Sequence, residues 1–130
     1  MKVLGVDIGG TKIRMGIVGL DGQVIEDLQV PTEVPLYPYL ETKILQLLSE
    51  HPEICAIGIG TRGMVDAENG VITFETETLP GWQGTEVKSL LEKASGLRVE
   101  VNNDANCASL AESMFGAAKG YRRTLCLTLG

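Results

Sequence analysis

The sequence predicts a mixed α/β sheet that opens with an antiparallel meander and continues with strands and helices in alternation. Two observations carry this fold class. Before residue 31, short apolar runs of strand length are separated by turns that contain glycine. After residue 31, apolar residues at helical spacing alternate with further strand-length runs, which is typical of parallel strands joined by crossover helices. The expected order is βββ-α-β-(β)-α-β-α-β.

The meander is expected at residues 3–7, 13–18 and 24–30. The first run is apolar and partly β-branched, and the second alternates apolar with polar or small residues. The dipeptide Asp21-Gly22 is a strong hairpin signal between the second and third strands. Pro31 ends the third strand.

The middle of the chain predicts one helix and two short strands. The helix ends at Pro52, and its apolar residues share one face: Leu40, Ile44, Leu47 and Leu48. Strands are expected at 54–60 and 71–74, with a loop over 61–70 between them. Residues 75–84 show no regular pattern.

Two more helices are expected in the last third. The first has Thr85 as its N-cap and Gly96 as its C′ residue, with apolar positions at Val87, Leu90, Leu91 and Ala94. A strand at 99–101 precedes the second helix, whose apolar stripe is Cys107, Leu110, Ala111, Met114, Phe115 and Ala118. A last strand is expected at 124–129.

Composition excludes several classes of function. The formal net charge of −6 disfavours nucleic acid and anionic membranes as general partners. No apolar run reaches the roughly 18 residues of a membrane span, and the N-terminus does not resemble a signal peptide. Cys55, Cys107 and Cys126 are widely spaced and the one histidine is His51, so no zinc site is expected here. Free thiols indicate a reducing, cytoplasmic location.

The segment Asp7-Ile8-Gly9-Gly10-Thr11-Lys12 lies between the first two strands and has the chemistry of a phosphate site. The glycines let backbone N–H groups approach a ligand, and the Thr11 hydroxyl adds a donor. Asp7 ends its strand and can hold Mg²⁺ directly or through water. An ordinary Gly-Gly hairpin is the competing interpretation, which the spacing alone favours.

Asp104 stands between a predicted strand and a predicted helix. Helix N–H groups favour its ionised form, and an ionised carboxylate can accept a proton from a sugar hydroxyl. The adjacent Asn103 donates and accepts hydrogen bonds, which suits a polyol. The competing interpretation, that Asp104 is only an N-cap, is favoured by sequence physics alone.

Four segments taken in order resemble the ROK (repressor, open reading frame, kinase) family of the actin and hexokinase superfamily. They are the phosphate segment at 7–12, Gly-Ile-Gly-Thr-Arg-Gly-Met-Val-Asp at 58–66, Leu-Pro-Gly-Trp at 79–82, and Asn-Asn-Asp-Ala-Asn-Cys-Ala at 102–108 with Ala-Glu at 111–112. This resemblance covers essentially the whole chain. It implies a ribonuclease H-like lobe of an ATP-dependent sugar kinase.

The resemblance also implies a role for each matching residue. By this resemblance Asp104 would be the general base, while the Mg²⁺ role expected of Asp7 rests on its place at the end of its strand. The implied ATP-phosphate residues are Gly9, Gly10, Thr11 and Lys12, and the implied sugar-side residues are Gly63, Thr78, Asn103 and Asp104.

Two positions depart from the family pattern. Arg62 stands where members commonly have proline, and Thr78 where many have asparagine. The change at Arg62 either alters specificity or leaves a solvated loop residue, and the sequence favours the solvated residue. Trp82 either packs a sugar face or, as the sequence favours, anchors its own loop. Cys107 is expected in the core rather than as a nucleophile.

Family members carry further motifs that are absent here: a second glycine-rich phosphate motif, a Glu-x-Gly-His sugar segment and a cysteine-rich zinc motif. We therefore expect residues 1–120 to form an N-terminal lobe and 121–130 to start the first strand of a second lobe. A phosphoryl-transfer site between two lobes is incomplete in one, so this chain alone is expected to be inactive. Zinc would belong to the missing part, and the full-length parent is expected to be a homodimer.

Three functions are open from the sequence. The leading one is the N-terminal lobe of a kinase for a hexose or N-acetylhexosamine, including glucose, N-acetylmannosamine, fructose-like hexoses and β-glucosides. A ROK-type transcriptional repressor places a helix-turn-helix domain before Asp7, where six residues leave no room. The third is a non-catalytic sugar-binding or interaction domain, which the joint presence of Asp7, Thr11, Asn103 and Asp104 argues against.

Overall fold

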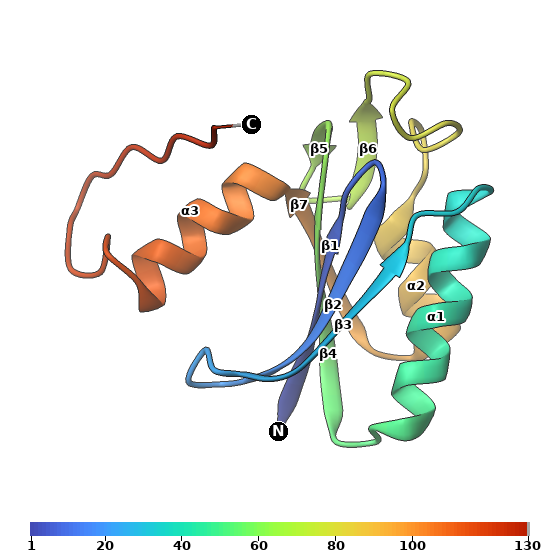
Figure 1. The fold of residues 1–130 in the computed structure, drawn as a ribbon, viewed down its shortest axis with the longest axis horizontal. Helices are drawn as coiled ribbons and strands as arrows, with labels where there is room; N and C mark the ends of the chain where they lie inside the picture. The colour runs from blue at the N-terminus through green and yellow to red at the C-terminus, as the bar shows by residue number, and fades with distance from the viewer. Residues whose placement is uncertain (130) are drawn as a thin grey trace.

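A five-stranded mixed sheet organises the chain in a computed structural model that describes residues 1–129 (Figure 1). The strand order is β3-β2-β1-β4-β7, and β5 and β6 form a separate two-stranded hairpin. The strands are β1 (Lys2–Ile8), β2 (Lys12–Gly19), β3 (Val24–Pro31), β4 (Ile54–Thr61), β5 (Met64–Asp66), β6 (Val71–Phe74) and β7 (Arg98–Asn103). The helices are α1 (Leu36–Glu50), α2 (Val87–Ser95) and α3 (Asp104–Phe115).

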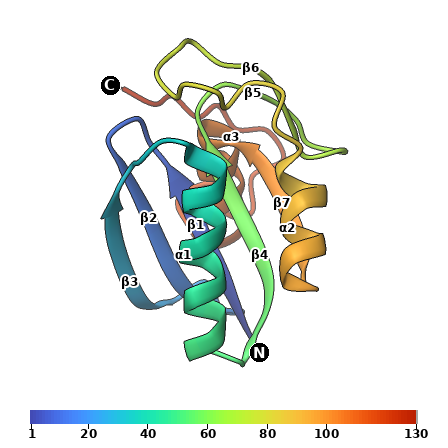
Figure 2. The same ribbon diagram turned by 90° about the vertical axis from the view of Figure 1, so that its right-hand side faces the viewer.

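The central strand β1 joins the two halves of the sheet. It pairs antiparallel with β2 and parallel with β4, and β4 pairs parallel with β7. The connections through α1 and α2 both cover the same face of the sheet, as Figure 2 shows. Parallel strands need such crossovers because the end of one strand and the start of the next lie at opposite edges of the sheet.

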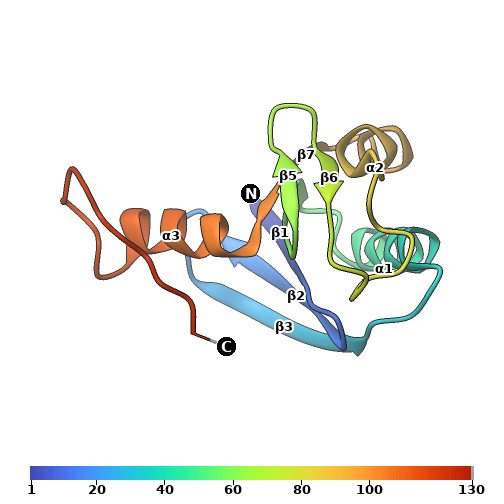
Figure 3. The ribbon, with the colours of Figure 1, turned by 90° about the horizontal axis from the view of Figure 1, so that it is seen from above.

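The hydrophobic core fills the space between the sheet and these two helices. Alternate residues of β1 and β2 point into it, as the period of two requires, whereas β3 is mostly exposed. Its members include Leu4, Val6 and Ile8 of β1, Ile57 and Ile59 of β4, Leu40 and Ile44 of α1, and Leu91 of α2, all nearly inaccessible to solvent. The opposite face of the sheet carries α3 (Figure 3).

Most of the expected elements are present, and the differences have local causes. The segment expected as a loop at 61–70 contains β5, which pairs with β6 around a turn closed by Asp66 and Asn69. The N-cap of α2 is Glu86, so the expectation of Thr85 was wrong: the Thr85 hydroxyl donates to the Gly81 carbonyl instead. Gly96 ends α2 with φ of 70°, as expected.

The C-terminal part differs more from the expectation. Helix α3 ends at Phe115, before Ala118, and no residue of it is fully buried. The described part of the segment expected as a strand at 124–129 has neither helix nor strand, since a strand requires a partner for its ladder. Leu125, Leu127 and Leu129 are at least three-quarters exposed. Gly130 lies outside the described residues.

Two further properties of the described part bear on the sequence predictions. None of its helices has the length and apolar character that a membrane crossing requires. Cys55, Cys107 and Cys126 are all free thiols, in agreement with the sequence.

The core predicts a measurable asymmetry between two leucines. Leu4 is completely buried on the central strand, whereas Leu20 is 64% exposed in the β2–β3 turn. We expect Leu4→Ala to lower the free energy of unfolding by about 2–5 kcal/mol. Leu20→Ala is the matched control and should change it by no more than about 0.5 kcal/mol. Urea denaturation measures both, and equal losses would contradict this packing.

Candidate active site at the carboxyl edge of the sheet

The candidate site is built on three strands whose carboxyl ends are level. In the register of β1, β4 and β7, Ile8 lies beside Thr61 and Thr61 beside Asn103. The next residue of each strand is Gly9, Arg62 and Asp104. Figure 1 shows the β1–β2 turn, the β5–β6 hairpin and the start of α3 together at this edge. Ligands of open α/β sheets bind at the carboxyl ends of the strands.

The β1–β2 turn has the hairpin geometry of the competing interpretation, yet its backbone remains available to a ligand. The Gly9 N–H donates to the Lys12 carbonyl at 3.0 Å, and the Gly9 carbonyl accepts from the Thr32 hydroxyl at 2.8 Å. Both backbone groups of Gly9 are therefore used in hydrogen bonds that stabilise the turn. The N–H groups of Gly10 and Thr11 donate to no residue among those described. Thr11 and Lys12 are exposed, so the turn offers donors and a cation to solvent.

Asp7 and Asp104 face the same side of the sheet. A Cβ added to Gly60 would lie 3.5 Å from the Cys107 sulfur and 3.7 Å from the Asp104 Cα, so this direction points at the first turn of α3. Asp7 is the register partner of Gly60, and its side chain shares that direction. Burial and the charges of Asp104 and Asp7 raise the pKa of the Cys107 thiol.

Asn103, rather than Asp104, caps α3. Its side-chain oxygen accepts from the Ala105 N–H at 2.9 Å and the Asn106 N–H at 3.4 Å, and its side-chain N–H donates to the Gly63 carbonyl at 2.8 Å. Asp104 is the first helical residue and is exposed, with one oxygen accepting from the Ala105 N–H at 2.8 Å. The interpretation of Asp104 as only an N-cap is therefore wrong, and the carboxylate is free to meet a ligand.

Gly63 has a structural requirement of its own. Its φ is 93°, and a Cβ there would collide with the Phe74 carbonyl of β6. The close approach of β6 thus explains this glycine without a ligand, while the hydrogen bond from Asn103 fixes its carbonyl beside α3.

The loop at 75–84 is joined to the same edge by one buried contact and is braced internally by a second set of polar contacts. Trp82 is completely buried, and its indole N–H donates to the Thr61 hydroxyl at 2.9 Å. Trp82 is therefore the loop anchor that the sequence favours. The Glu75 carboxylate accepts from the Thr78 hydroxyl and from the Leu79 N–H, the latter at 3.1 Å. The Thr78 hydroxyl is thus engaged inside its own loop.

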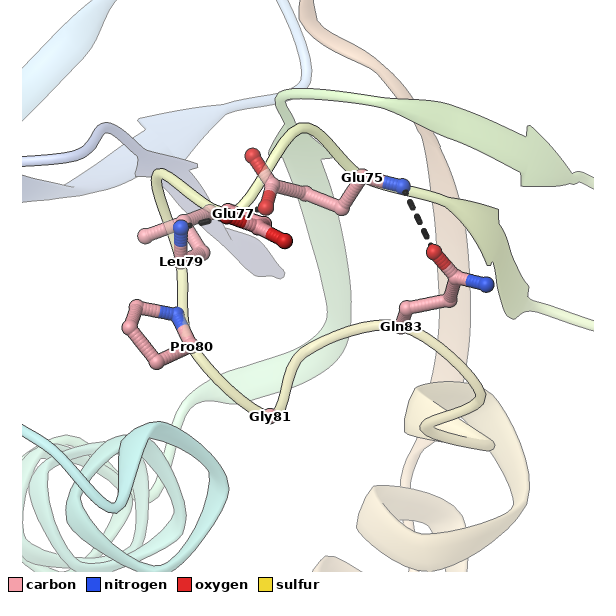
Figure 4. A pocket seen from close by; sticks show the side chains of 6 residues that line it. All are labelled: Glu75, Glu77, Leu79, Pro80, Gly81 and Gln83. Carbon is pink, nitrogen blue, oxygen red and sulfur yellow. Dashed lines mark hydrogen bonds between the residues drawn. The ribbon is translucent and has the colours of Figure 1, made fainter.

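Glu75 was not singled out by sequence reasoning. Burial raises the pKa of its carboxyl, but the hydrogen bonds from Thr78 and Leu79 outweigh burial and hold it below the usual range. Its backbone N–H also donates to the Gln83 side chain (Figure 4). In this polar stretch, no pattern distinguishes Glu75 from Glu77. Both line a pocket together with Leu79, Pro80, Gly81 and Gln83. Asp7 and Asp104 are not among the residues that line this pocket.

Asp7 fits Mg²⁺ as one carboxylate among other ligands. Within residues 1–129 no three histidine, cysteine or acidic side chains gather into a metal cluster. Magnesium usually takes only one or two carboxylates and completes its shell with water and substrate phosphates. The exposed Asp7 carboxylate beside the β1–β2 turn has the chemistry for that arrangement.

Comparisons with known proteins show the family of the chain. Residues 3–130 match the profile described as "ROK family". A glucokinase of Streptomyces coelicolor is 37% identical over 98% of this chain and 40% of its own length. A beta-glucoside kinase of Klebsiella pneumoniae is 35% identical over 100% and 43%. The chain thus spans about two fifths of the length of these curated relatives.

Solved structures give the same result. A ROK family glucokinase from Streptomyces griseus in complex with glucose and AMPPNP superimposes with a TM-score of 0.78 at 34% identity, over 92% of this chain and 38% of that one. A ROK family transcriptional regulator at 22% identity, with a TM-score of 0.77 over 88% of this chain and 30% of its own, shares the fold. The ribonuclease H-like lobe expected from the sequence is confirmed. On the family match across nearly its whole length, the chain belongs to the ROK family.

Proposed function

We propose that this chain is the N-terminal lobe of an ATP-dependent kinase that phosphorylates a hydroxyl of a hexose or N-acetylhexosamine. One observation carries the proposal. The β1–β2 turn, which has free N–H donors, follows β1, and the exposed carboxylate of Asp104 follows β7. The carboxyl ends of these strands are level in the sheet. Phosphoryl transfer needs these two parts: donors for the phosphates and a base for the attacking hydroxyl. The names of the related glucokinase and beta-glucoside kinase support a sugar as the acceptor.

Asp104 would act as the general base. Its carboxylate is exposed and held at the start of α3 by the Ala105 N–H. Asn103 has one amide N–H beyond its bond to Gly63, and this group would donate to a sugar hydroxyl.

The β1–β2 turn would bind the phosphates of ATP. The N–H groups of Gly10 and Thr11 and the Thr11 hydroxyl would donate hydrogen bonds to the phosphate oxygens. Lys12, at the start of β2, would contribute a positive charge. Asp7 would hold Mg²⁺, which supplies neutralisation of phosphate charge when bound. These residues bind and orient the donor, while Asp104 receives the proton.

We further propose that residues 1–120 form one lobe and that 121–130 begin another. The exposed leucines at 125, 127 and 129 support a neighbour that is outside the described residues. The relatives are more than twice as long as the chain. In the full-length parent, proposed to be a homodimer, the second lobe would complete the ATP and sugar contacts.

The direct test measures ADP formed by the full-length parent with ATP and a panel of glucose, N-acetylmannosamine, fructose and a β-glucoside. We expect production of ADP that depends on at least one of these sugars, and calorimetric binding of that sugar. Binding without turnover would favour the non-catalytic alternative.

Asp104→Asn tests the proposed base in the full-length parent. Asparagine keeps the size of the side chain, and Asn103 still caps α3, so the thermal midpoint should change little. Loss of proton acceptance should lower kcat by about 10²–10⁴-fold with a far smaller change in sugar affinity. The control Asp21→Asn, in the exposed β2–β3 turn, should leave kcat unchanged. Normal turnover of Asp104→Asn would exclude the catalytic role.

Thr11→Val tests the phosphate turn. Valine keeps the shape of threonine but removes the hydroxyl, and a hydrogen bond to a charged group contributes about 1.5–3 kcal/mol. We expect kcat/KM for ATP to fall by about tenfold or more, with sugar binding retained. Thr42→Val on α1, away from this edge, is the matched control. An unchanged kcat/KM for ATP in Thr11→Val would contradict phosphate binding by the Thr11 hydroxyl.

A further inference from the structure

Arg62 occupies the middle position of the three strand ends. Thr61 lies between Ile8 and Asn103 in the register of the sheet. Arg62 therefore follows its strand between Gly9, which opens the phosphate turn, and Asp104, the proposed base. A group passing from the phosphate turn to a hydroxyl at Asp104 must cross the part of the edge where Arg62 stands.

The Arg62 side chain extends toward the phosphate turn. A Cβ built on Gly10 would lie 3.4 Å from the Arg62 Nη1 atom and 3.7 Å from the Thr78 carbonyl oxygen. The guanidinium thus lies close to Gly10 of the β1–β2 turn, within ordinary contact distance of where a side chain at that position would begin.

The charge of Arg62 is available to a ligand. The side chain is exposed. Within residues 1–129 it makes no contact closer than 4.0 Å with a carboxylate. The basic residues that do are Lys2, Arg14, His51, Lys88 and Arg98. Its field reaches the buried Glu75 carboxylate, whose pKa it helps to lower, but Glu75 already accepts from Thr78 and Leu79.

We propose that Arg62 binds the phosphoryl group in transit from ATP to the sugar, as a charge-stabilising residue of the active site. This inference rests on the proposed kinase function. It replaces the interpretation of Arg62 as a solvated loop residue.

The chemistry of the step explains why a guanidinium suits this position. The sugar hydroxyl oxygen bonds to the γ-phosphorus, and the bond from that phosphorus to the oxygen bridging to the β-phosphate breaks. The electron pair of the broken bond stays on ADP, and the hydroxyl proton goes to Asp104. Negative charge resides on the three non-bridging oxygens, two of which match the planar fork of arginine. Charge-stabilising donors of this kind contribute most when they are fixed before reaction.

The test compares Arg62→Met and Arg62→Lys in the full-length parent. Methionine keeps much of the length but not the charge, and we expect kcat to fall by about 10²-fold. The KM for sugar should stay within about twofold, and the thermal midpoint should hold because the side chain is exposed. Lysine should restore part of kcat, since it returns the charge without the fork. The control Arg98→Met removes another exposed arginine, at the amino end of β7, and should leave kcat unchanged.

The outcomes separate this inference from the proposed function. Wild-type kcat in Arg62→Met would overturn the role of Arg62 while the kinase function stands. A raised sugar KM and a lower thermal midpoint with normal kcat would also overturn the role of Arg62, because these changes indicate that Arg62 only supports the structure of the 75–84 loop. If the parent turns over no sugar, the proposed function fails, and calorimetry with inorganic triphosphate still tests Arg62. Weaker triphosphate binding in Arg62→Met than in Arg98→Met would support an anion site, and equal binding would overturn it.

Discussion

The level ends of β1, β4 and β7 are the constraint on which the candidate site depends. Because Ile8, Thr61 and Asn103 share one row, the β1–β2 turn, Arg62 and Asp104 start side by side. A shift of one residue in either pairing would turn these side chains to the other face of the sheet. The buried alternation of the strands fixes that register, so the hydrophobic core positions the polar edge.

Three polar contacts hold the edge in place where the strands end. Trp82 fastens the 75–84 loop to Thr61, and Asn103 links the start of α3 to Gly63. Thr32 closes the β1–β2 turn from the end of β3. In each contact, a polar group that could otherwise bind a ligand is hydrogen-bonded within the protein. Among the described residues, Asp104 accepts only from the Ala105 N–H, and the Gly10 and Thr11 N–H groups of the β1–β2 turn have no acceptor. These groups have the chemistry of a base and an anion site.

The sequence predicted most of the strands and helices because those segments have a clear period and most end at or near glycine or proline. Thr85 failed as a cap because a tertiary contact to Gly81 took its hydroxyl. Strand β5 was missed because three residues are too few to show a period. Asp7, Asp104 and the glycine turn could be found from the resemblance, whereas Glu75 and the approach of Arg62 to Gly10 required coordinates. Both depend on how loops distant in sequence meet.

The central claim is that one edge of the sheet brings a phosphoryl donor to a sugar hydroxyl beside Asp104. A crystal structure of the full-length parent with its sugar and a non-hydrolysable ATP analogue tests it most directly. The account predicts a sugar hydroxyl about 2.6–3.2 Å from the Asp104 carboxylate and the γ-phosphate between the β1–β2 turn and that hydroxyl. A sugar bound elsewhere, or a γ-phosphate away from this turn, would contradict it.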